Sequence, residues 1–334
     1  MTHSQLATYL QIAITNNFPV LIKGKPGIGK SDIVEQACRA AGADLIISHP
    51  VVSDPTDYKG LPFANNKGEA EFLPFTDLKA LMTATAKLVF FIDDIGQAPA
   101  SVQAAVMQLL LARQINGHKI SDFVTFIAAT NRKEDKAGVS GVLEPVKSRF
   151  ASIVELEVST DDWISWALTN NMPIELIAFI RYRPELLDKF EASKDIVNTP
   201  TPRTVANLGK QQSVGLPLEL EYEIYKGAAG DAFATEYTAF LSIYRNLPNV
   251  DQIILNPTGS DVPSEVSILY ALCGALAHRL SDNNIAAVAT YLDRMPAEFA
   301  VSCIKDAITR KPQLTNTAGY IQFATSKTGK MILS

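Results

Sequence analysis

The sequence predicts an α/β fold, in which a parallel sheet covered by helices on both faces is followed by a helical half. Up to about residue 160, short β-type runs alternate with segments of helical pattern, which is typical of strands joined by crossover helices. Beyond that point apolar residues recur at helical spacing, as in "PIELIAFIRY" and "SEVSILYALCGALAHRL". The expected strands are "FPVLIKG", "ADLIISH", "KLVFFIDD", "DFVTFIAATN" and "SIVELEV".

Two stretches interrupt this alternation, "LPFANNKGEAEF" and "RQINGHKISDF". Each contains an Asn/Gly/Lys turn between two short extended arms, which predicts a β-hairpin that projects from the core. Between the strands, residues 30–41 and 100–112 have the apolar spacing of helices.

Composition narrows the classes of protein to consider. The 334-residue chain is 47% hydrophobic and 19% charged, which is typical of a globular protein with a sizeable core. Its apolar runs are much shorter than the ~20 residues of a membrane span, and its first residues lack a signal-peptide pattern, so we expect a cytoplasmic protein outside the membrane. A net charge of −5 does not favour nucleic acid as the partner. Cys38, Cys273 and Cys303 have no metal-ligand spacing and are interpreted as structural thiols.

The strongest motif directly follows the first expected strand. Residues 24–31, "GKPGIGKS", match GxxxxGK[ST] in full between a strand and a helix, which is the context of a phosphate-binding loop. Glycines let backbone amides point at phosphate oxygens, and the next helix adds the positive end of its dipole. We expect Lys30 to contact the β and γ phosphates and Ser31 to bind Mg²⁺. The other expected binding residues of the loop are Gly24, Pro26, Gly27, Ile28 and Gly29.

Two further expected strands end in polar residues. The apolar run of "LVFFIDD" suits a central strand, and Asp93 at its end is expected to bind the nucleotide's Mg²⁺ through its water shell. Asp94 follows where a carboxylate can orient the attacking water, although the acidic pair can instead cap the next helix. Asn131 ends the strand "FIAATN", where an amide can hold that water or sense the γ phosphate.

Taken together, these motifs resemble those of the AAA+ ATPases and, within them, the MoxR-like group. The resemblance is carried by "GKPGIGKS", "LVFFIDDIGQAPASVQAAVMQLL", "FIAATNR", "LEPVKSRF" and "TPR", in that order. Both expected hairpins also fall where such proteins carry inserts. The resemblance implies a P-loop AAA+ αβα core at residues 1–158, a helical lid at 159–234 and a C-terminal helical extension at 235–334.

The resemblance also assigns roles to single residues. It implies that Asn131 is the first sensor and that Arg149 of "SRF" is an arginine finger, which reaches the nucleotide of the next subunit. Arg203 of "TPR" corresponds to the second sensor on the lid. Lys147 and Arg132 are rivals for the contact across the subunit junction. Guanidinium groups suit these places because negative charge builds on the γ phosphate in the transition state.

The function that the resemblance implies is Mg²⁺-dependent ATP hydrolysis by a homo-oligomeric ring, most simply a hexamer. Such a ring acts as a remodelling or maturation chaperone on a protein partner, commonly one with a von Willebrand factor A domain. Asp94 departs from the family pattern, which has Glu, and its side chain is shorter by one methylene. Because catalytic geometry is sensitive to shifts of about 1 Å, we expect slow hydrolysis. The alternatives are a nucleotide-gated scaffold with negligible turnover and, less favoured, a nucleic-acid motor or loader.

Overall fold

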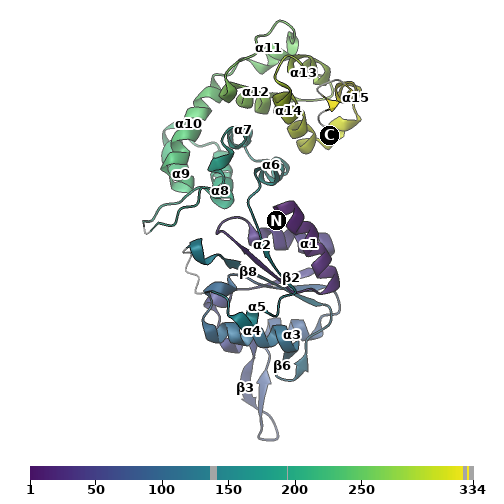
Figure 1. Ribbon diagram of the computed structural model, residues 1–334, viewed down its shortest axis with the longest axis vertical. Coiled ribbons are helices and arrows are strands. Elements are labelled where there is room, and N and C mark those ends of the chain that lie inside the picture. The colour runs from purple at the N-terminus through teal and green to yellow at the C-terminus, as the bar shows by residue number, and fades with distance from the viewer. Residues whose placement is uncertain (136–140, 194, 326–328, 331–334) are drawn as a thin grey trace. The chain divides into compact units, whose positions relative to one another are not determined.

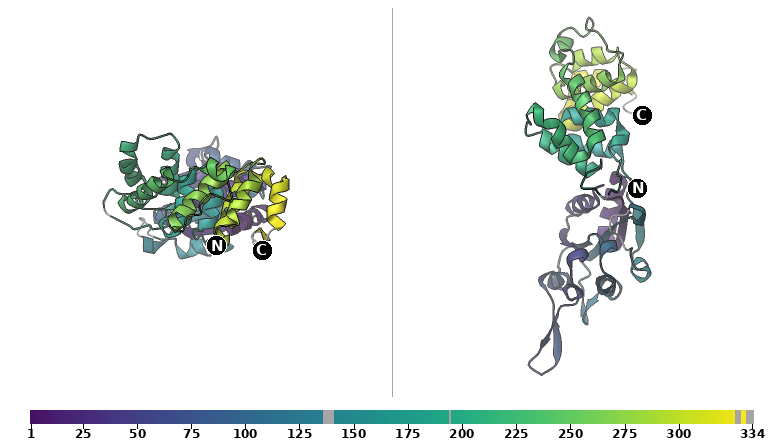
Figure 2. Two further views of the ribbon diagram at one scale, coloured as in Figure 1. Left: turned by 90° about the horizontal axis from the view of Figure 1, so that it is seen from above. Right: turned by 90° about the vertical axis from the view of Figure 1, so that its left-hand side faces the viewer.

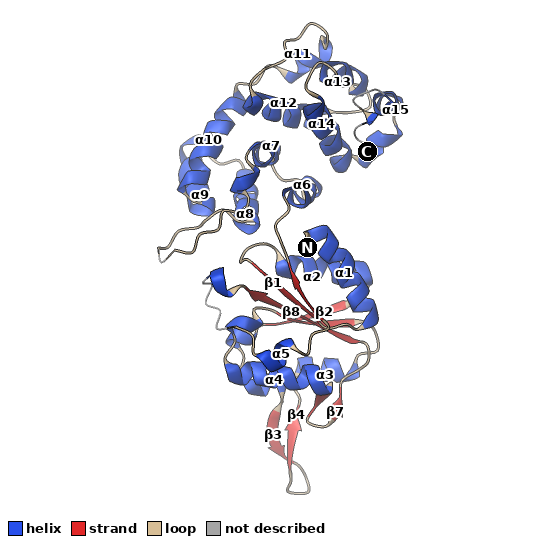
Figure 3. Cartoon of the chain, viewed as in Figure 1, coloured by secondary structure: helices blue, strands red, loops and turns tan. Residues whose placement is uncertain are grey.

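The computed structural model divides the chain into two compact units, Met1–Ser159 and Thr160–Ser334, each of which is described by itself (Figure 1). The first unit combines strands with helices, whereas the described residues of the second form helices and no strand (Figure 3). The predicted α/β fold with a helical C-terminal half is therefore confirmed. The residues that the structure describes are 1–135, 141–193, 195–325 and 329–330.

A five-stranded parallel sheet forms the centre of the first unit, in the order β2-β5-β8-β1-β9. Strands β5 and β8 are buried along their whole length, as expected for central strands that helices cover on both faces. All the strands expected from the sequence are present. They are β1 (Val20–Gly24), β2 (Asp44–Ser48), β5 (Leu88–Ile92), β8 (Val124–Asn131) and β9 (Ser152–Glu155).

Helices cover both faces of this sheet (Figure 3). Helices α1 and α2 pack with Val89 and Phe91 on one face, and α3 and α4 pack with Phe90 on the other. Because successive side chains of a strand point to opposite faces, the unbroken apolar run of β5 supplies both cores. The four helices are α1 (His3–Asn16), α2 (Lys30–Ala41), α3 (Thr76–Thr83) and α4 (Ala100–Ala112).

Both predicted hairpins are present. The longer one pairs β3 with β4 and extends outward from the first unit, at the lower end of the right-hand view in Figure 2. Gly60 precedes it with a φ of 88°, and a Cβ at this position would lie 2.5 Å from the carbonyl oxygen of Leu73, so only glycine fits at the base of the hairpin. The strands are β3 (Leu61–Ala64), β4 (Ala70–Leu73), β6 (Gln114–Ile115) and β7 (His118–Lys119).

Helix α1 was not among the expected elements, although its start carries a sequence signature. The Thr2 hydroxyl accepts a hydrogen bond from the backbone N–H of Gln5, and the Gln5 side chain accepts one from the N–H of Thr2. This reciprocal pair is a capping box, and the pattern T-x-x-Q before an apolar run predicts it. Short helical segments join the larger elements: the 3₁₀ helices η1 (Pro50–Val52), η2 (Pro55–Tyr58), η3 (Ile95–Gln97) and η4 (Lys133–Asp135), and the short α-helix α5 (Glu144–Lys147).

The second unit is built from packed helices. An aromatic cluster centred on Phe179 joins α7 to α10 through Phe233, Tyr237 and Phe240, with ring centroids 5.0–5.5 Å from that of Phe179. The helical elements are α6 (Thr160–Thr169), α7 (Ile174–Tyr182), η5 (Pro184–Leu186), α8 (Pro202–Gln212), α9 (Leu218–Ala229), α10 (Asp231–Arg245), α11 (Val250–Leu255), α12 (Val266–Arg279), α13 (Ile285–Leu292), α14 (Ala297–Arg310), η6 (Pro312–Asn316) and α15 (Ala318–Thr325).

The predicted boundary between lid and extension, after residue 234, falls inside the continuous helix α10. Phe233 precedes this boundary and Tyr237 follows it, and both rings contact Phe179. The structure therefore offers no break at that point, and the separate lid and extension stay a prediction. Within the described residues, none of the helices is long and apolar enough to cross a bilayer. The cytoplasmic localisation stays a prediction.

Candidate active site

The carboxyl ends of β1, β5 and β8 lie at one edge of the sheet because the strands are parallel. Gly24, the last residue of β1, pairs with Asn131, the last residue of β8. Asp93 and Asp94 follow directly after β5, the strand on the other side of β8. The topology therefore brings together polar side chains that the sequence places in three separate segments.

Residues 24–31 form a tight loop between β1 and α2. Gly27 and Gly29 have φ angles of 74° and 89°, in the left-handed region that favours glycine. At Gly24, a Cβ would lie 2.6 Å from Cδ1 of Ile28 and 3.0 Å from the carbonyl oxygen of Leu156. Helix α2 begins at the end of the loop, and its first backbone N–H groups point back toward it. These are the backbone features that an anion-binding loop requires.

Lys30 is buried in this loop, with 6% of its surface exposed. Its ammonium group donates hydrogen bonds to the carbonyl oxygens of Gly24 and Lys25, at 3.1 and 2.8 Å, and to Oδ1 of Asn131 at 2.7 Å. These three acceptors are neutral oxygens. Phosphate oxygens would form stronger, charge-assisted hydrogen bonds with the same ammonium group, so the lysine is placed to accept an anionic ligand.

Ser31 and Asp93 form the second contact of the site. The Ser31 hydroxyl donates to Oδ2 of Asp93 at 2.7 Å, while Oδ1 of Asp93 accepts from the backbone N–H of Asp94 at 3.0 Å. Hydroxyl and carboxylate oxygens are the ligands that Mg²⁺ prefers, and nucleotide-bound Mg²⁺ is held by one or two of them together with phosphates and water. The residues present therefore fit the predicted magnesium site.

Asn131 connects the phosphate loop to the second aspartate. Its Oδ1 accepts from Lys30, and its Nδ2 donates to Oδ1 of Asp94 at 3.2 Å. Asp94 has a left-handed backbone, with a φ of 53°, which is uncommon outside glycine and concentrates at functional sites. The amide thus holds the Asp94 carboxylate and the Lys30 ammonium on its two sides. Asp94 precedes the short turn η3 but makes no side-chain cap to it.

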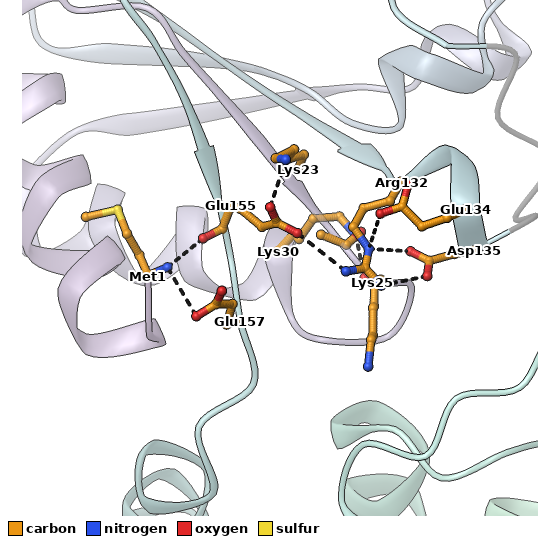
Figure 4. Close-up of polar contacts among 10 residues, drawn as sticks. Met1, Lys23, Lys25, Lys30, Arg132, Glu134, Asp135, Glu155 and Glu157 are labelled. Carbon is orange, nitrogen blue, oxygen red and sulfur yellow. Dashed lines mark hydrogen bonds and ion pairs between the residues drawn. The ribbon is translucent and has the colours of Figure 1, made fainter.

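Arg132, one of the predicted rivals for the subunit contact, is bound within its own chain (Figure 4). Its guanidinium group makes two hydrogen bonds to Asp135, at 2.7 and 2.9 Å, and a weaker one to Glu155 at 3.4 Å. Glu134 lies 3.5 Å from the same group. The ion pair with Arg132, together with Lys25 and Lys30, holds the pKa of Asp135 below its usual range. Arg132 is therefore engaged by carboxylates of its own chain.

Arg149 has a different environment. Its Nη1 donates to the Ser148 hydroxyl at 3.2 Å, its buried Nε has no hydrogen-bond partner, and it forms no ion pair with any residue that the structure describes. Lys147, the other predicted rival, pairs with Glu144. Of the three cations weighed from the sequence, Arg149 is thus the one that carries no carboxylate partner in the described part of the chain.

Sequence reasoning missed a group of residues beside the loop. Lys23 pairs with Glu155 at 2.7 Å, and the N-terminal ammonium of Met1 donates to the backbone oxygen of Glu155 at 2.7 Å (Figure 4). His3 lies against the loop, since its Nε2 is 2.6 Å from the carbonyl oxygen of Ile28, to which it donates. The capping box of α1 was the available signal for His3, because it places the start of this helix, whereas these long-range pairs have no local pattern.

Arg203, the predicted second sensor, is the second residue of α8 in the helical unit, and its side chain is exposed. The preceding Thr201 caps this helix by accepting from the backbone N–H of Thr204 at 3.2 Å. Because Arg203 belongs to the second unit, its contact with the nucleotide stays a prediction. The roles of the other site residues likewise rest on their contacts and on the motif.

A known family model matches the segment of the chain that contains these residues. Residues 19–150 match the family model of the AAA domain of the dynein-related subfamily, a segment that runs from the start of β1 to just before β9 and is less than half of the chain. It contains the phosphate loop, Asp93, Asp94 and Asn131, and it ends immediately after Arg149.

Solved structures show weaker likeness. RuvB from Thermotoga maritima, described as a Holliday junction branch migration motor, is 18% identical with a TM-score of 0.40, over 82% of this chain and 80% of that one. NtrX from Brucella abortus is 12% identical with a TM-score of 0.43, over 99% and 67%. A putative ATPase from Cytophaga hutchinsonii is 14% identical with a TM-score of 0.36, over 92% and 80%.

The assignment therefore rests on the family match and on the contacts at the sheet edge. A complete phosphate loop, a serine–aspartate pair suited to Mg²⁺, and an asparagine that joins the loop lysine to a second aspartate lie within the matched segment. Residues 19–150 of this chain therefore match an AAA domain, the domain found in the AAA+ ATPases.

Proposed function

We propose that this protein is a Mg²⁺-dependent, ATP-hydrolysing AAA+ enzyme of the MoxR-like kind, which works as a homo-oligomeric ring, most simply a hexamer. In this proposal it acts as a remodelling or maturation chaperone on a protein partner. The observation that carries the proposal is the chain of contacts from Lys30 through Asn131 to Asp94, beside the Ser31–Asp93 pair.

Each contact supports one part of ATP hydrolysis. Lys30 exchanges its neutral acceptors for phosphate oxygens, while the backbone N–H groups at the start of α2 bind the same anion. Ser31 and Asp93 would hold Mg²⁺, which would supply positive charge to the phosphates. Asp94, held by the Asn131 amide, orients the attacking water from the end of the neighbouring strand.

The missing part of this site is a positive charge for the γ phosphate in the transition state. Arg149 is the cation best suited to supply it to a neighbouring subunit, because Arg132 is engaged by Asp135 and Glu155, whereas Arg149 has no ion pair within the described residues. An arginine donated in trans makes hydrolysis depend on assembly. Ring formation and the hexameric state are part of the proposal.

Exposed apolar side chains support a protein as the partner. Leu61, Phe63 and Leu73 of the β3–β4 hairpin have 48%, 64% and 51% of their surface exposed. Apolar groups on a projecting element favour contact with another apolar surface over contact with phosphates. A partner with a von Willebrand factor A domain is proposed from the resemblance to MoxR-like proteins alone.

The test is steady-state ATP hydrolysis measured against protein concentration, with mass photometry on the same samples with and without ATP. A rate per subunit that rises as rings form is the expected result. Lys30→Ala is the control, because loss of the buried ammonium group should abolish nucleotide binding and turnover at every concentration. A rate per subunit that stays constant while rings form would contradict the trans-acting arginine.

A nucleotide-gated scaffold is the second candidate, and the position of Asp94 favours it. The carboxylate is one methylene shorter than the glutamate of the family, and both its backbone and its contact with Asn131 hold it in place. ATP-dependent rings without turnover would support this candidate. Recovery of turnover in Asp94→Glu would then assign the loss to the missing methylene. Binding to duplex or single-stranded DNA that weakens steeply with salt would point to the nucleic-acid motor instead.

A further inference from the structure

The first unit has a cleft away from the phosphate loop, between η1, η2, the start of α3, the end of β2 and the middle of β5. Its volume is about 430 Å³, which is within the range of ligand-binding clefts, roughly 300–1,000 Å³. All of its lining residues lie between residues 47 and 90, so it belongs to one compact unit. None of its lining residues is among the side chains that form the nucleotide site.

The cleft has an apolar floor and an apolar rim. Tyr58, Leu78 and Phe90 line the floor and are buried, whereas Val52 and Phe75 on the rim have 86% and 39% of their surface exposed. A valine with so little cover makes few contacts with its own chain. The shape and the rim are therefore suited to receive an apolar side chain of another molecule.

The charge of the cleft is negative. Asp57 and Asp77 line it, together with His49, and none of its lining residues is a lysine or an arginine. Oδ2 of Asp57 accepts from the backbone N–H of Asp54, but neither Asp57 nor Asp77 forms an ion pair with a residue that the structure describes. Two carboxylates beside an apolar floor favour an occupant that carries a cation next to its apolar group.

The cleft is also connected to the strand end that carries Asp93. The backbone N–H of Asp93 donates to the carbonyl oxygen of Ser48 at 2.9 Å, and the hydroxyl groups of Ser48 and Tyr58 share a hydrogen bond of 2.7 Å. Tyr58 in turn donates to the Ser53 hydroxyl at 3.3 Å. Turn η1, on the rim, contacts η3, which directly follows Asp94. A group bound in the cleft therefore touches the elements that position both aspartates.

We propose that this cleft binds a segment of the protein partner in which an apolar side chain is flanked by lysine or arginine. The apolar side chain packs against Val52 and Phe75 above the buried floor, and the cations pair with Asp57 and Asp77. Occupancy is transmitted through Ser48 and η1 to the Asp93–Asp94 corner and changes the rate of ATP turnover. The binding step stands by itself, whereas its effect on turnover rests on the proposed function.

The binding test uses nucleotide-free full-length protein and a fluorescein-labelled peptide of alternating lysine and leucine, followed by fluorescence anisotropy. The matched peptide of alternating glutamate and leucine has the same apolar groups with the opposite charge. We expect saturable binding of the lysine peptide only. Absence of its binding at millimolar protein, or equal binding of both peptides, would overturn the proposal.

Variants locate the binding. The double variant Asp57→Asn with Asp77→Asn keeps an oxygen acceptor for the Asp54 N–H and removes both charges, and we expect at least tenfold weaker binding. Val52→Lys places a cation on the rim at a position too exposed to unfold the protein, and we expect a similar loss. Glu35→Gln is the control, because it removes an exposed carboxylate outside the cleft. Unchanged binding in the first two variants would overturn the assignment.

ATP turnover and ring formation in mass photometry are two further readouts that separate the possible outcomes. Binding together with a changed ATP turnover supports the full proposal, and binding with unchanged turnover overturns the coupling. Binding by a protein that hydrolyses no ATP at any concentration supports the cleft and contradicts the proposed enzyme. If Val52→Lys abolishes rings in mass photometry and the lysine peptide does not bind wild type, the cleft is a contact between copies of this chain and the partner assignment is wrong.

Discussion

Each unit contains a buried aspartate that makes two hydrogen bonds to one arginine, and the two pairs behave differently. Asp135 pairs with Arg132 beside the phosphate loop, and Asp306 pairs with Arg181 between α14 and α7. The pKa of Asp135 is held below its usual range, chiefly by its hydrogen bonds to Arg132. The pKa of Asp306 is raised, because burial in the helical core outweighs the attraction of Arg181.

The difference lies in the surroundings rather than in the pair. Asp135 is also near Lys25 and Lys30, whose charges gather where the loop can bind an anion. Asp306 lies among the packed helices of the second unit, where desolvation dominates. A buried ion pair is therefore not by itself a sign of function. Its position relative to the strand ends and the phosphate loop distinguishes the two.

The largest expected effect is at Arg149, which forms no ion pair with a residue that the structure describes. Arg149→Ala should leave ATP binding by single subunits intact and lower the turnover of assembled rings about 10³-fold or more, because it removes a trans-acting guanidinium. Turnover and nucleotide binding are measured at a protein concentration at which rings form. Lys147→Ala is the matched control and should change little, since Lys147 pairs with Glu144. Full turnover in the Arg149 variant would remove it from the site.

The second effect is on stability and lies in the helical unit. Asp306→Ala leaves Arg181 without its partner, and breaking a buried pair in this way should lower the free energy of unfolding by about 3–5 kcal/mol. Chemical denaturation gives this value. At temperatures where the variant is folded, nucleotide binding should match that of wild type. A specific loss of nucleotide binding would mean that this pair, too, belongs to the functional site.

A smaller effect is expected at the amide that connects Lys30 to Asp94. Asn131→Ala removes both hydrogen bonds and should lower turnover about 10²-fold, the loss typical of one positioned donor, with a modest effect on nucleotide affinity. Single-turnover kinetics separate the two quantities. If affinity and turnover fell equally, Asn131 would act in binding rather than in the hydrolysis step.

The smallest expected effect is the pH dependence of stability, which allows a direct comparison of Asp135 with Asp306. The pKa of Asp135 is lowered in the folded state. Its ionised carboxylate therefore stabilises the fold above the pKa of the unfolded state, about 3.9, and this stabilisation is lost as pH falls through the pKa of the folded state. Asp135→Asn should therefore cost about 1–3 kcal/mol at pH 7 and progressively less below about pH 4. Urea denaturation at several pH values measures this.

The contribution of Asp306 to stability depends on pH in the opposite direction. Its raised pKa means that its contribution is fully present below the unfolded value and diminishes as pH rises through the folded value. The stability difference between wild type and Asp306→Asn should then change with pH in the opposite direction to that of Asp135→Asn. Parallel pH profiles for the two variants would show that the surroundings do not distinguish the pairs.

Much of the first unit was predictable from sequence. The strands, the two hairpins and the phosphate loop have local signals: apolar runs, turn residues and spaced glycines, which neighbouring residues alone can satisfy. Helix α1 was missed although Thr2 and Gln5 carry its capping pattern. The predicted boundary between lid and extension lies inside α10 and stays a prediction, because the periodicity of a helix does not show where one packed group of helices ends.

The sequence by itself determined the α/β fold, the phosphate loop and the polar residues at the ends of three strands, because these depend on contacts and spacings local to each segment. Only the tertiary structure decided how those residues meet. Asn131 lies 101 positions after Lys30. The pairing of β1 with β8 places Asn131 beside Gly24 and so within hydrogen-bond distance of Lys30. Likewise, Arg132 pairs with its sequence neighbour Asp135, and the fold adds the more distant Glu155, while Arg149 has no ion pair among the described residues. Such choices among similar side chains depend on which charges the fold brings within a few ångströms, and sequence spacing does not contain that information.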